Sequence, residues 1–294
     1  AMAVEKAKET DAELVMASDP DADRVGAAVK NNEGEWVLLN GNQTALMFVY
    51  YLITRWKELG KINGKEYIVK TIVTTETIKT IAERNGVEMY DVYTGLKWIG
   101  NVMRENEGKK NYIGGGEESY GFLCEDFVRD KDAVSACVIL AEIAAWAKDQ
   151  GLSLYQLLQK IYVEYGFSKE KGISVVKKGK SGAEEIEAMM KKFRENPLTE
   201  IAGSKVTYFY DYSTLKGKDY AENETVTLDM PTTSNVLQYF TEDNTKVSIR
   251  PSGTEPKIKF YCEVHSKVKS IDELPEAEKA AEEKINQIKA SLGI

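Results

Sequence analysis

Strand-like and helix-like runs alternate between residues 66 and 165, and this alternation restricts the fold more than any other feature of the sequence. Apolar runs rich in β-branched and aromatic residues predict strands at 67–73, 87–93 and 112–113, the last of them ending in three glycines at 114–116. Helical patterns are predicted at 75–85, 132–148 and 153–165. Alternation at this spacing favours a mixed-sheet α/β domain whose strands are mainly parallel.

The flanking segments predict two further parts. Before this region, strands are expected at 14–17 and 25–29 around a polar loop, followed by a buried helix at 43–59. Residues 168–182 are rich in Lys, Gly and Ser and predict a linker and an edge. Beyond them we expect helices at 183–194 and 274–292, β-segments at 206–210 and 225–230, and a hairpin with arms at 246–249 and 257–264.

The part of the chain after residue 166 is therefore expected to form a separate α+β domain with an antiparallel sheet, distinct from the mixed-sheet α/β domain before it.

Composition excludes several classes of function. The 294 residues carry a net charge of −8, which argues against nucleic acid as the main partner because a phosphate backbone requires a basic surface. The longest apolar stretch, at 45–53, is far shorter than the roughly 18 to 20 residues of a membrane span, and no signal-peptide pattern opens the chain, so a cytoplasmic location is expected. The sequence leaves the oligomeric state open.

Cysteine and histidine are too scarce for several kinds of site. Cys124, Cys137 and Cys262 are widely spaced within apolar runs, which predicts small buried side chains and not a disulfide framework. The single histidine, His265, excludes a multi-histidine metal site and has no nucleophile beside it, so we interpret it as a surface residue.

Alternating aspartates form the sharpest local motif. Asp19, Asp21 and Asp23 occupy a short loop and could converge on one hard cation, while the neighbouring Arg24 could contact a phosphate. An EF-hand is excluded because Arg24 stands where the turn glycine belongs. A solvated acidic turn is the alternative.

Two other loops combine glycine with polar side chains. Residues 114–121 include Glu117 and Ser119, which suit a hydroxyl-rich ligand, although a flexible loop remains the alternative. A Rossmann loop is excluded because Ser119 occupies the position of the third glycine. Arg250, Ser252, Gly253 and Thr254 lie between the hairpin arms and predict an anion cradle, with an ordinary hairpin turn as the alternative.

Two charged positions near predicted strand and helix ends are also candidates. Lys97 follows a strand of the α/β unit, where ligands often meet open sheets, although a solvated lysine is the alternative. Residues 129–132 form a short segment of four charged residues that includes Lys131, and Asp132 is the expected helix N-cap.

Four of these motifs in this order resemble the signature loops of the α-D-phosphohexomutases, the phosphoglucomutase and phosphomannomutase enzymes. They are residues 19–24 (Asp-Pro-Asp-Ala-Asp-Arg), 94–97 (Thr-Gly-Leu-Lys), 116–119 (Gly-Glu-Glu-Ser) and 250–256 (Arg-Pro-Ser-Gly-Thr-Glu-Pro). The resemblance implies an isomerase that interconverts hexose 1-phosphate and hexose 6-phosphate, of glucose or mannose, through a phosphoserine and a hexose 1,6-bisphosphate intermediate. A small phosphosugar is then the expected partner.

The resemblance also implies a role for each matching residue. Asp19, Asp21 and Asp23 would hold Mg²⁺, and Arg24 would contact the phosphoserine. Gly95 and Lys97 would orient the sugar, while Glu117 and Ser119 would bind its hydroxyls. The phosphate that is not transferred would be held by Arg250, Ser252, Gly253 and Thr254. Lys131 would be the general acid/base, because the histidine that some phosphomannomutases use after the sugar loop is replaced here by the pair Phe122 and Leu123.

The family's serine loop, of the Thr-Ala-Ser-His-Asn-Pro type, is absent from the sequence. We therefore expect a carboxy-terminal portion of such an enzyme, inactive by itself. By the resemblance, residues 1–39 would be the end of a partial α/β domain that carries the metal loop, residues 40–166 an α/β sugar-binding domain, and residues 167–294 an α+β phosphate-binding domain. One alternative is a sugar-phosphate-binding module or regulator without catalysis. Another is a metal-dependent phosphatase with Asp19 as its nucleophile.

Overall fold

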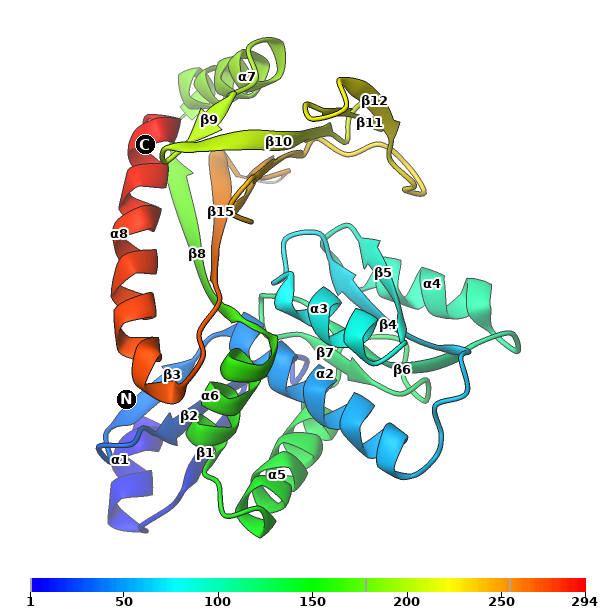
Figure 1. The fold of residues 1–294 in the computed structure, drawn as a ribbon, viewed down its shortest axis with the longest axis vertical. Coiled ribbons are helices and arrows are strands. Elements are labelled where there is room, and N and C mark those ends of the chain that lie inside the picture. The colour runs from blue at the N-terminus through cyan, green and yellow to red at the C-terminus, as the bar shows by residue number, and fades with distance from the viewer. Residues whose placement is uncertain (1, 178, 254) are drawn as a thin grey trace. The chain divides into compact units, whose positions relative to one another are not determined.

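The computed structural model describes residues 2–177, 179–253 and 255–294. The chain divides into two compact units, one ending at Gly166 and the other beginning at Phe167 (Figure 1). None of the helices among the described residues is both long and apolar enough to span a membrane.

A three-stranded antiparallel sheet opens the first unit. It has the order β1-β2-β3 and is preceded by a short helix, α1 (Met2–Glu9). Its strands are β1 (Leu14–Ser18), β2 (Val25–Lys30) and β3 (Trp36–Leu39). The cross-strand pair Ser18 and Val25 closes the β1–β2 hairpin. The predicted strand, loop and strand are confirmed, and all six residues from 19 to 24 lie in the loop.

The second sheet of this unit is mixed, as predicted. Its order is β5-β4-β6-β7, in which β4 pairs in parallel with β5 and β6 while β7 is antiparallel. The strands are β4 (Glu66–Thr71), β5 (Glu88–Val92), β6 (Asn111–Gly116) and β7 (Phe122–Cys124). The glycines at 114–116 were expected to follow the third strand, but they lie within it because β4 and β7 both pair with them.

Four helices contact strands of this mixed sheet, and a fifth, α6, packs on three of them and on β2 (Figure 1). They are α2 (Gly41–Glu58), α3 (Thr77–Arg84), α4 (Lys97–Asn106), α5 (Ala133–Asp149) and α6 (Leu154–Tyr165). The Asp132 carboxylate accepts hydrogen bonds from the amides of Val134 and Ser135, which confirms the predicted N-cap. Side chains of α4, among them Ile99 and Met103, pack on β4 and bury its face.

The second unit is built on an antiparallel sheet, as predicted. Its order is β12-β11-β10-β13-β14-β15-β8, and the short β9 pairs with β10. The strands are β8 (Phe167–Val176), β9 (Glu200–Ile201), β10 (Ser204–Asp211), β11 (Lys216–Asp219), β12 (Glu224–Thr227), β13 (Leu237–Thr241), β14 (Lys246–Pro251) and β15 (Lys257–Ser266). The edge predicted within 168–182 is confirmed, because β8 is the last strand of the sheet and pairs with β15 over ten residues. The predicted linker is wrong, because β8 continues to Val176 and helix α7 (Gly179–Glu195) already covers 179–182.

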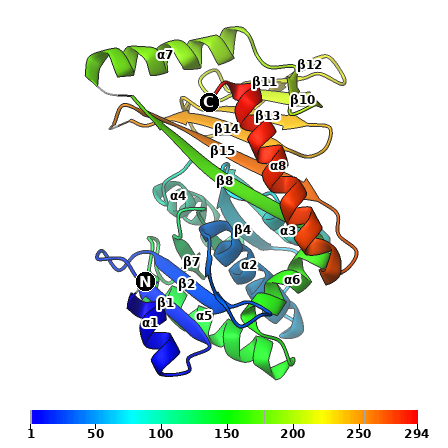
Figure 2. The ribbon, with the colours of Figure 1, turned by 90° about the vertical axis from the view of Figure 1, so that its left-hand side faces the viewer.

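Two long helices belong to this sheet. α7 (Gly179–Glu195) contacts β14 and β15, and α8 (Leu274–Leu292), preceded by the short η1 (Ile271–Glu273), lies across β8 and β15 (Figure 2). The apolar face predicted for β15 is confirmed, since all four of its residues are buried: Ile258, Phe260, Cys262 and Val264. Cys124 is also buried, whereas Cys137 is half-buried, and all three cysteines are free thiols.

Candidate functional site

The predicted site residues are divided between the two units. The first unit carries the acidic loop, Gly95, Lys97, Glu117, Ser119 and Lys131. The second carries Arg250, Ser252 and Gly253. Thr254, which was expected to complete the anion cradle, lies outside the described residues. Each group is described within its own unit.

Internal hydrogen bonds fold the acidic loop (residues 18–24) around Asp19. Its carboxylate accepts hydrogen bonds from the Arg24 guanidinium Nε at 2.7 Å and from the amides of Asp23 and Arg24. Partial burial opposes ionisation of Asp19, but these hydrogen bonds outweigh it and lower the pKa of the carboxyl to about 2. Asp19 is therefore an anion throughout the physiological pH range.

Asp23 faces a different cation. Its Oδ2 lies 2.5 Å from the Nζ of Lys131, and its buried Oδ1 has no hydrogen-bond partner among the described residues but lies 3.6 Å from the Nε of Arg24. The amide of Ala133 donates to the Ala22 carbonyl, which fixes this loop to the start of α5. The structure thus brings Lys131 and the acidic loop together.

The three aspartates are not gathered around one point. Arg24 and Lys131 occupy the carboxylates of Asp19 and Asp23, and Asp21 is exposed. Within residues 2–177, 179–253 and 255–294, no group of three or more acidic, histidine or cysteine side chains is arranged to hold a metal ion. The oxygen donors suit Mg²⁺ chemically, and Asp23 Oδ1, which no hydrogen bond among the described residues occupies, could accept a cation, but the observed arrangement is an ion-paired loop.

The Glu117 loop (residues 116–121) follows β6 at the carboxyl edge of the parallel strands. Glu117 is only 7% exposed, and its Oε1 accepts a hydrogen bond from the Gly95 amide at 2.6 Å. Its Oε2 accepts a longer one, 3.4 Å, from the Ser119 hydroxyl. Gly95 has a φ of +112°, which glycine adopts readily. Two predicted sugar-binding residues, Gly95 and Ser119, therefore converge on the carboxylate of a third, Glu117.

Lys97 lies at the edge of this group. It is the first residue of α4, its side chain is exposed, and its Nζ stacks 4.9 Å from the centre of the Trp98 ring. Its backbone belongs to the segment that supplies the Gly95 amide, although its side chain points to an aromatic ring in this structure.

The acidic loop and the Glu117 loop are neighbours. The amide of Val25, next to Arg24, donates to the carbonyl of Tyr120. A methyl group added at Gly121 would lie 2.9 Å from the Cδ of Lys131, so the lysine stem crosses directly over this glycine. The first unit therefore assembles one polar site from segments that are far apart in the sequence.

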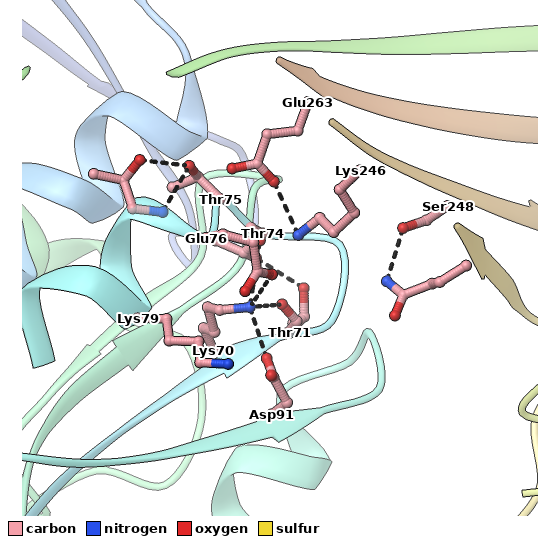
Figure 3. Close-up of polar contacts among 12 residues, drawn as sticks. Lys70, Thr71, Thr74, Thr75, Glu76, Lys79, Asp91, Lys246, Ser248 and Glu263 are labelled. Carbon is pink, nitrogen blue, oxygen red and sulfur yellow. Dashed lines mark hydrogen bonds and ion pairs between the residues drawn. The ribbon is translucent and has the colours of Figure 1, made fainter. Parts of the chain in front are cut away.

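A buried lysine cluster lies beside this site and was not predicted. Lys70, near the carboxyl end of β4, is fully buried, and its Nζ lies 2.9 Å from Glu76 and 2.7 Å from Asp91 (Figure 3). A lysine within the apolar run Tyr-Ile-Val-Lys-Thr-Ile-Val was the available signal, because a charged residue in a buried strand requires partners.

The candidate anion cradle of the second unit connects β14 to β15. The amide of Ser252 donates to the Lys257 carbonyl at 2.8 Å, and the Ser252 hydroxyl accepts from the Glu255 amide. Arg250 is half-buried and pairs with Lys259 in the cross-strand register. The motif does link the arms of a hairpin, and it also presents a guanidinium and a hydroxyl at the hairpin end.

A pocket of about 520 Å³ lies beside this hairpin end. Ser252 and Lys257 line one side, and Met190 and Arg194 of α7 line another. The guanidinium of Arg194 is held by Asp211 and Asn235. Ser252 of the candidate cradle thus borders a concave surface.

His265 is not the surface residue that the sequence suggested. Its side chain is 17% exposed, and its Nε2 lies 2.7 Å from Glu263, which also pairs with Lys246 at 2.9 Å (Figure 3 draws Glu263 and Lys246). Burial lowers the pKa of His265, but the Glu263 carboxylate outweighs that effect and raises it. The buried carboxylate explains why the imidazole is drawn inward.

Comparison with known proteins matches both units to one family. The family model "Phosphoglucomutase/phosphomannomutase, alpha/beta/alpha domain III" matches residues 40–165, and the model of the same family's C-terminal domain matches residues 174–281. The chain is 38% identical over 259 residues to a phosphoglucomutase of Staphylococcus aureus, covering 88% of this chain and 46% of that protein. It is 33% identical over 264 residues to a phosphoglucomutase of Staphylococcus haemolyticus, covering 90% and 47%.

Solved structures agree on the fold. A phosphoglucomutase/phosphomannomutase family protein of Burkholderia thailandensis has a TM-score of 0.60 at 18% identity, covering 99% of this chain and 49% of that chain. The open form of parafusin from Paramecium has a TM-score of 0.58 at 18% identity, covering 88% and 41%. The chain spans about half the length of the relatives that it matches.

Proposed function

Because the chain belongs to the phosphoglucomutase/phosphomannomutase family, we propose that it supplies the sugar- and phosphate-binding part of a hexose-phosphate mutase. The reaction would interconvert hexose 1-phosphate and hexose 6-phosphate of glucose or mannose, with a hexose 1,6-bisphosphate intermediate. The observation that carries the proposal is the convergence of the Gly95 amide and the Ser119 hydroxyl on the buried carboxylate of Glu117.

Each part of the site has a proposed task. Glu117 and Ser119 bind sugar hydroxyls, because a carboxylate accepts hydrogen bonds from hydroxyl donors. The Gly95–Lys97 segment sets the position of the sugar, and Arg250 with Ser252, Gly253 and Thr254 holds the phosphate that is not transferred. A cradle that recognises only phosphate serves both orientations of the bisphosphate.

Lys131 and Arg24 have tasks at the reacting group. We assign to Lys131 the movement of the hydroxyl proton, and to Arg24 the offset of phosphoryl charge. Mg²⁺, held by Asp19, Asp21 and Asp23, would supply further charge neutralisation when bound. Since Arg24 and Lys131 now pair with Asp19 and Asp23, the cation would compete with them for these carboxylates.

We also propose a domain organisation and a cellular location for the chain. Residues 1–39, which carry the acidic loop, would be the end of a domain, followed by a sugar-binding domain at 40–166 and a phosphate-binding domain at 167–294. A cytoplasmic location fits a metabolic enzyme of this kind.

A second candidate function is a sugar-phosphate-binding module or regulator without catalysis. The ion-paired acidic loop favours it, because a loop whose aspartates are neutralised by Arg24 and Lys131 can contribute to binding without a metal.

One assay separates the two functions. The chain is incubated with glucose 1-phosphate and a trace of glucose 1,6-bisphosphate, with and without the phosphoserine-bearing portion of the Staphylococcus aureus relative. The mutase proposal expects glucose 6-phosphate only when that portion is supplied. Calorimetric binding of glucose 6-phosphate with no turnover in either mixture supports the module, and absence of binding contradicts both.

A further inference from the structure

The first turn of α2 lies directly against the Glu117 loop. Gly41 is buried, and a Cβ at this position would lie 2.0 Å from the carbonyl oxygen of Glu118 and 2.8 Å from the amide nitrogen of Tyr120. Both distances fall well inside van der Waals contact, and both neighbours are backbone atoms. Any side chain at 41 must therefore displace the loop that carries Glu117 and Ser119.

A second support reaches the same loop from the segment after β4, the threonine loop (residues 71–76). The Thr71 and Thr74 hydroxyls lie 2.8 Å apart, so one donates to the other, and they lie 3.3 and 3.5 Å from Oε2 of Glu118, to which the remaining hydroxyl proton is donated. The Glu118 amide donates to the Thr74 hydroxyl at 3.2 Å. Thr74 thus holds both the backbone and the side chain of the residue between Glu117 and Ser119.

The two supports are themselves joined. Asn42, the residue after Gly41, accepts a hydrogen bond from the Thr75 amide at 2.9 Å. The buried Nζ of Lys70 lies 3.5 Å from the carbonyls of Thr71 and Thr74 and is paired with Glu76 (Figure 3). The first turn of α2, the threonine loop and the Glu117 loop therefore form one hydrogen-bonded and close-packed unit.

We propose that Gly41 and Thr74 are positioning residues for sugar recognition. Neither is assigned a contact with the ligand; they fix the backbone of Glu118, and through it the carboxylate of Glu117 and the hydroxyl of Ser119. The inference rests on the proposed function in one respect, namely that Glu117 and Ser119 bind the sugar.

Two pairs of variants test it. Gly41→Ala adds the clashing methyl group, and Gly26→Ala is its control, because a Cβ at Gly26 meets only the Ala17 carbonyl at an ordinary 3.9 Å. Thr74→Val removes the hydroxyl at constant shape, and Thr74→Ser restores it. Thermal unfolding checks that each variant is folded. If Gly41→Ala does not fold, the comparison of Thr74→Val with Thr74→Ser alone tests the inference.

The first measurement needs no ligand. The Gly95 amide donates to Glu117 at 2.6 Å, so its proton resonance reports the position of the carboxylate. We expect this resonance to move upfield in Gly41→Ala and Thr74→Val, and to stay near its original position in Gly26→Ala and Thr74→Ser.

The second measurement is calorimetric binding of glucose 6-phosphate and of inorganic phosphate. We expect glucose 6-phosphate to bind on the order of 10- to 100-fold more weakly to the two disruptive variants, since misplacement of a positioned group by about 1 Å can have effects of this size. Affinity for inorganic phosphate should stay unchanged, because the cradle lies in the other unit.

The outcomes separate the inference from the proposed function. If the Gly95 resonance does not move in the disruptive variants, or if Thr74→Ser behaves as Thr74→Val does, the positioning inference is overturned. If the resonance moves as expected but the unaltered chain binds glucose 6-phosphate no better than inorganic phosphate, the positioning of Glu117 stands and the sugar-binding function falls.

Discussion

Replacement of Arg250 by alanine tests the anion cradle most directly. Arg250 is the second-last residue of β14, half-buried, and two positions before Ser252 at the hairpin end. Loss of one partner from a buried charge pair costs about 2 to 5 kcal/mol in binding free energy. Because Arg250 is half-buried and solvent screens part of its charge, the lower limit of about 2 kcal/mol applies, which corresponds to about 30-fold weaker binding.

The assay is isothermal titration of inorganic phosphate and of glucose 6-phosphate. Both ligands should lose affinity for Arg250→Ala by about the same factor, since the proposed cradle would recognise the phosphate alone. Arg250→Lys should bind both ligands with an affinity between those of the unaltered chain and Arg250→Ala, because lysine keeps the charge and lacks the bidentate guanidinium.

The matched control is Lys259→Ala. Lys259 is also half-buried and lies opposite Arg250 in the strand register, so its loss removes the same charge from the same sheet. We expect Lys259→Ala to weaken the binding of either ligand by less than about threefold, because solvent screens the charge of Lys259. An equal loss in both alanine variants would show general electrostatic attraction, and an unchanged affinity in Arg250→Ala would refute the cradle.

Three further predictions concern stability. Glu66→Gln should lower the free energy of unfolding by about 2 to 3 kcal/mol in urea titrations, because the buried Glu66 carboxylate accepts three backbone amides and the side-chain amide of Asn111 as charge-assisted hydrogen bonds; a change below about 0.5 kcal/mol would contradict this account. Asp132→Ala should lower the free energy of unfolding by about 1 kcal/mol because the α5 N-cap is lost, and Asp132→Asn should keep most of the N-cap stabilisation. The raised pKa of His265 implies stability that is fully present below its ordinary pKa of about 6.5 and is lost as pH rises through the raised value. Urea titrations across this range should show the decline in the unaltered chain and a weaker one in His265→Gln; identical pH profiles would exclude the Glu263 pairing as its source.

The spacing of apolar residues was sufficient to predict most of the long helices and strands. It failed for β8 and α4, where charged residues, glycine or asparagine interrupt the apolar pattern. β8 was interpreted in part as a linker because charges interrupt it. The structure shows why a strand tolerates them: Lys169 and Lys171 pair with Glu278 and Glu282 of α8, which lies across this edge strand. Partners more than 100 residues away cannot be read from a local window.

α4 was missed for a related reason. Its apolar residues, including Ile99 and Met103, follow a helical spacing, but Gly100 and two asparagines interrupt the run. Packing on β4 stabilises a helix that local propensity alone does not predict.

The candidate site was predicted as separate motifs, and the structure supplies their connections. Gly95 and Glu117 are 22 residues apart in the sequence, yet one hydrogen bond joins them. The pairing of Lys131 with Asp23 spans more than 100 residues and follows from the attachment of the acidic loop to α5. The roles of Gly41 and Thr74 could not be predicted, because they depend on backbone contacts that no motif records.

In the proposed sugar-binding role, the hydrogen bonds of Glu117 would also affect the thermodynamics of ligand binding. A ligand-binding carboxylate on a mobile, solvent-exposed side chain must be ordered when a sugar binds, and each immobilised side chain adds an entropic cost to binding. Here the Gly95 amide and the Ser119 hydroxyl already fix both oxygens, and burial already excludes most water. Each oxygen keeps lone-pair capacity for a further donor, so an arriving hydroxyl meets an acceptor whose ordering cost was met when the chain folded.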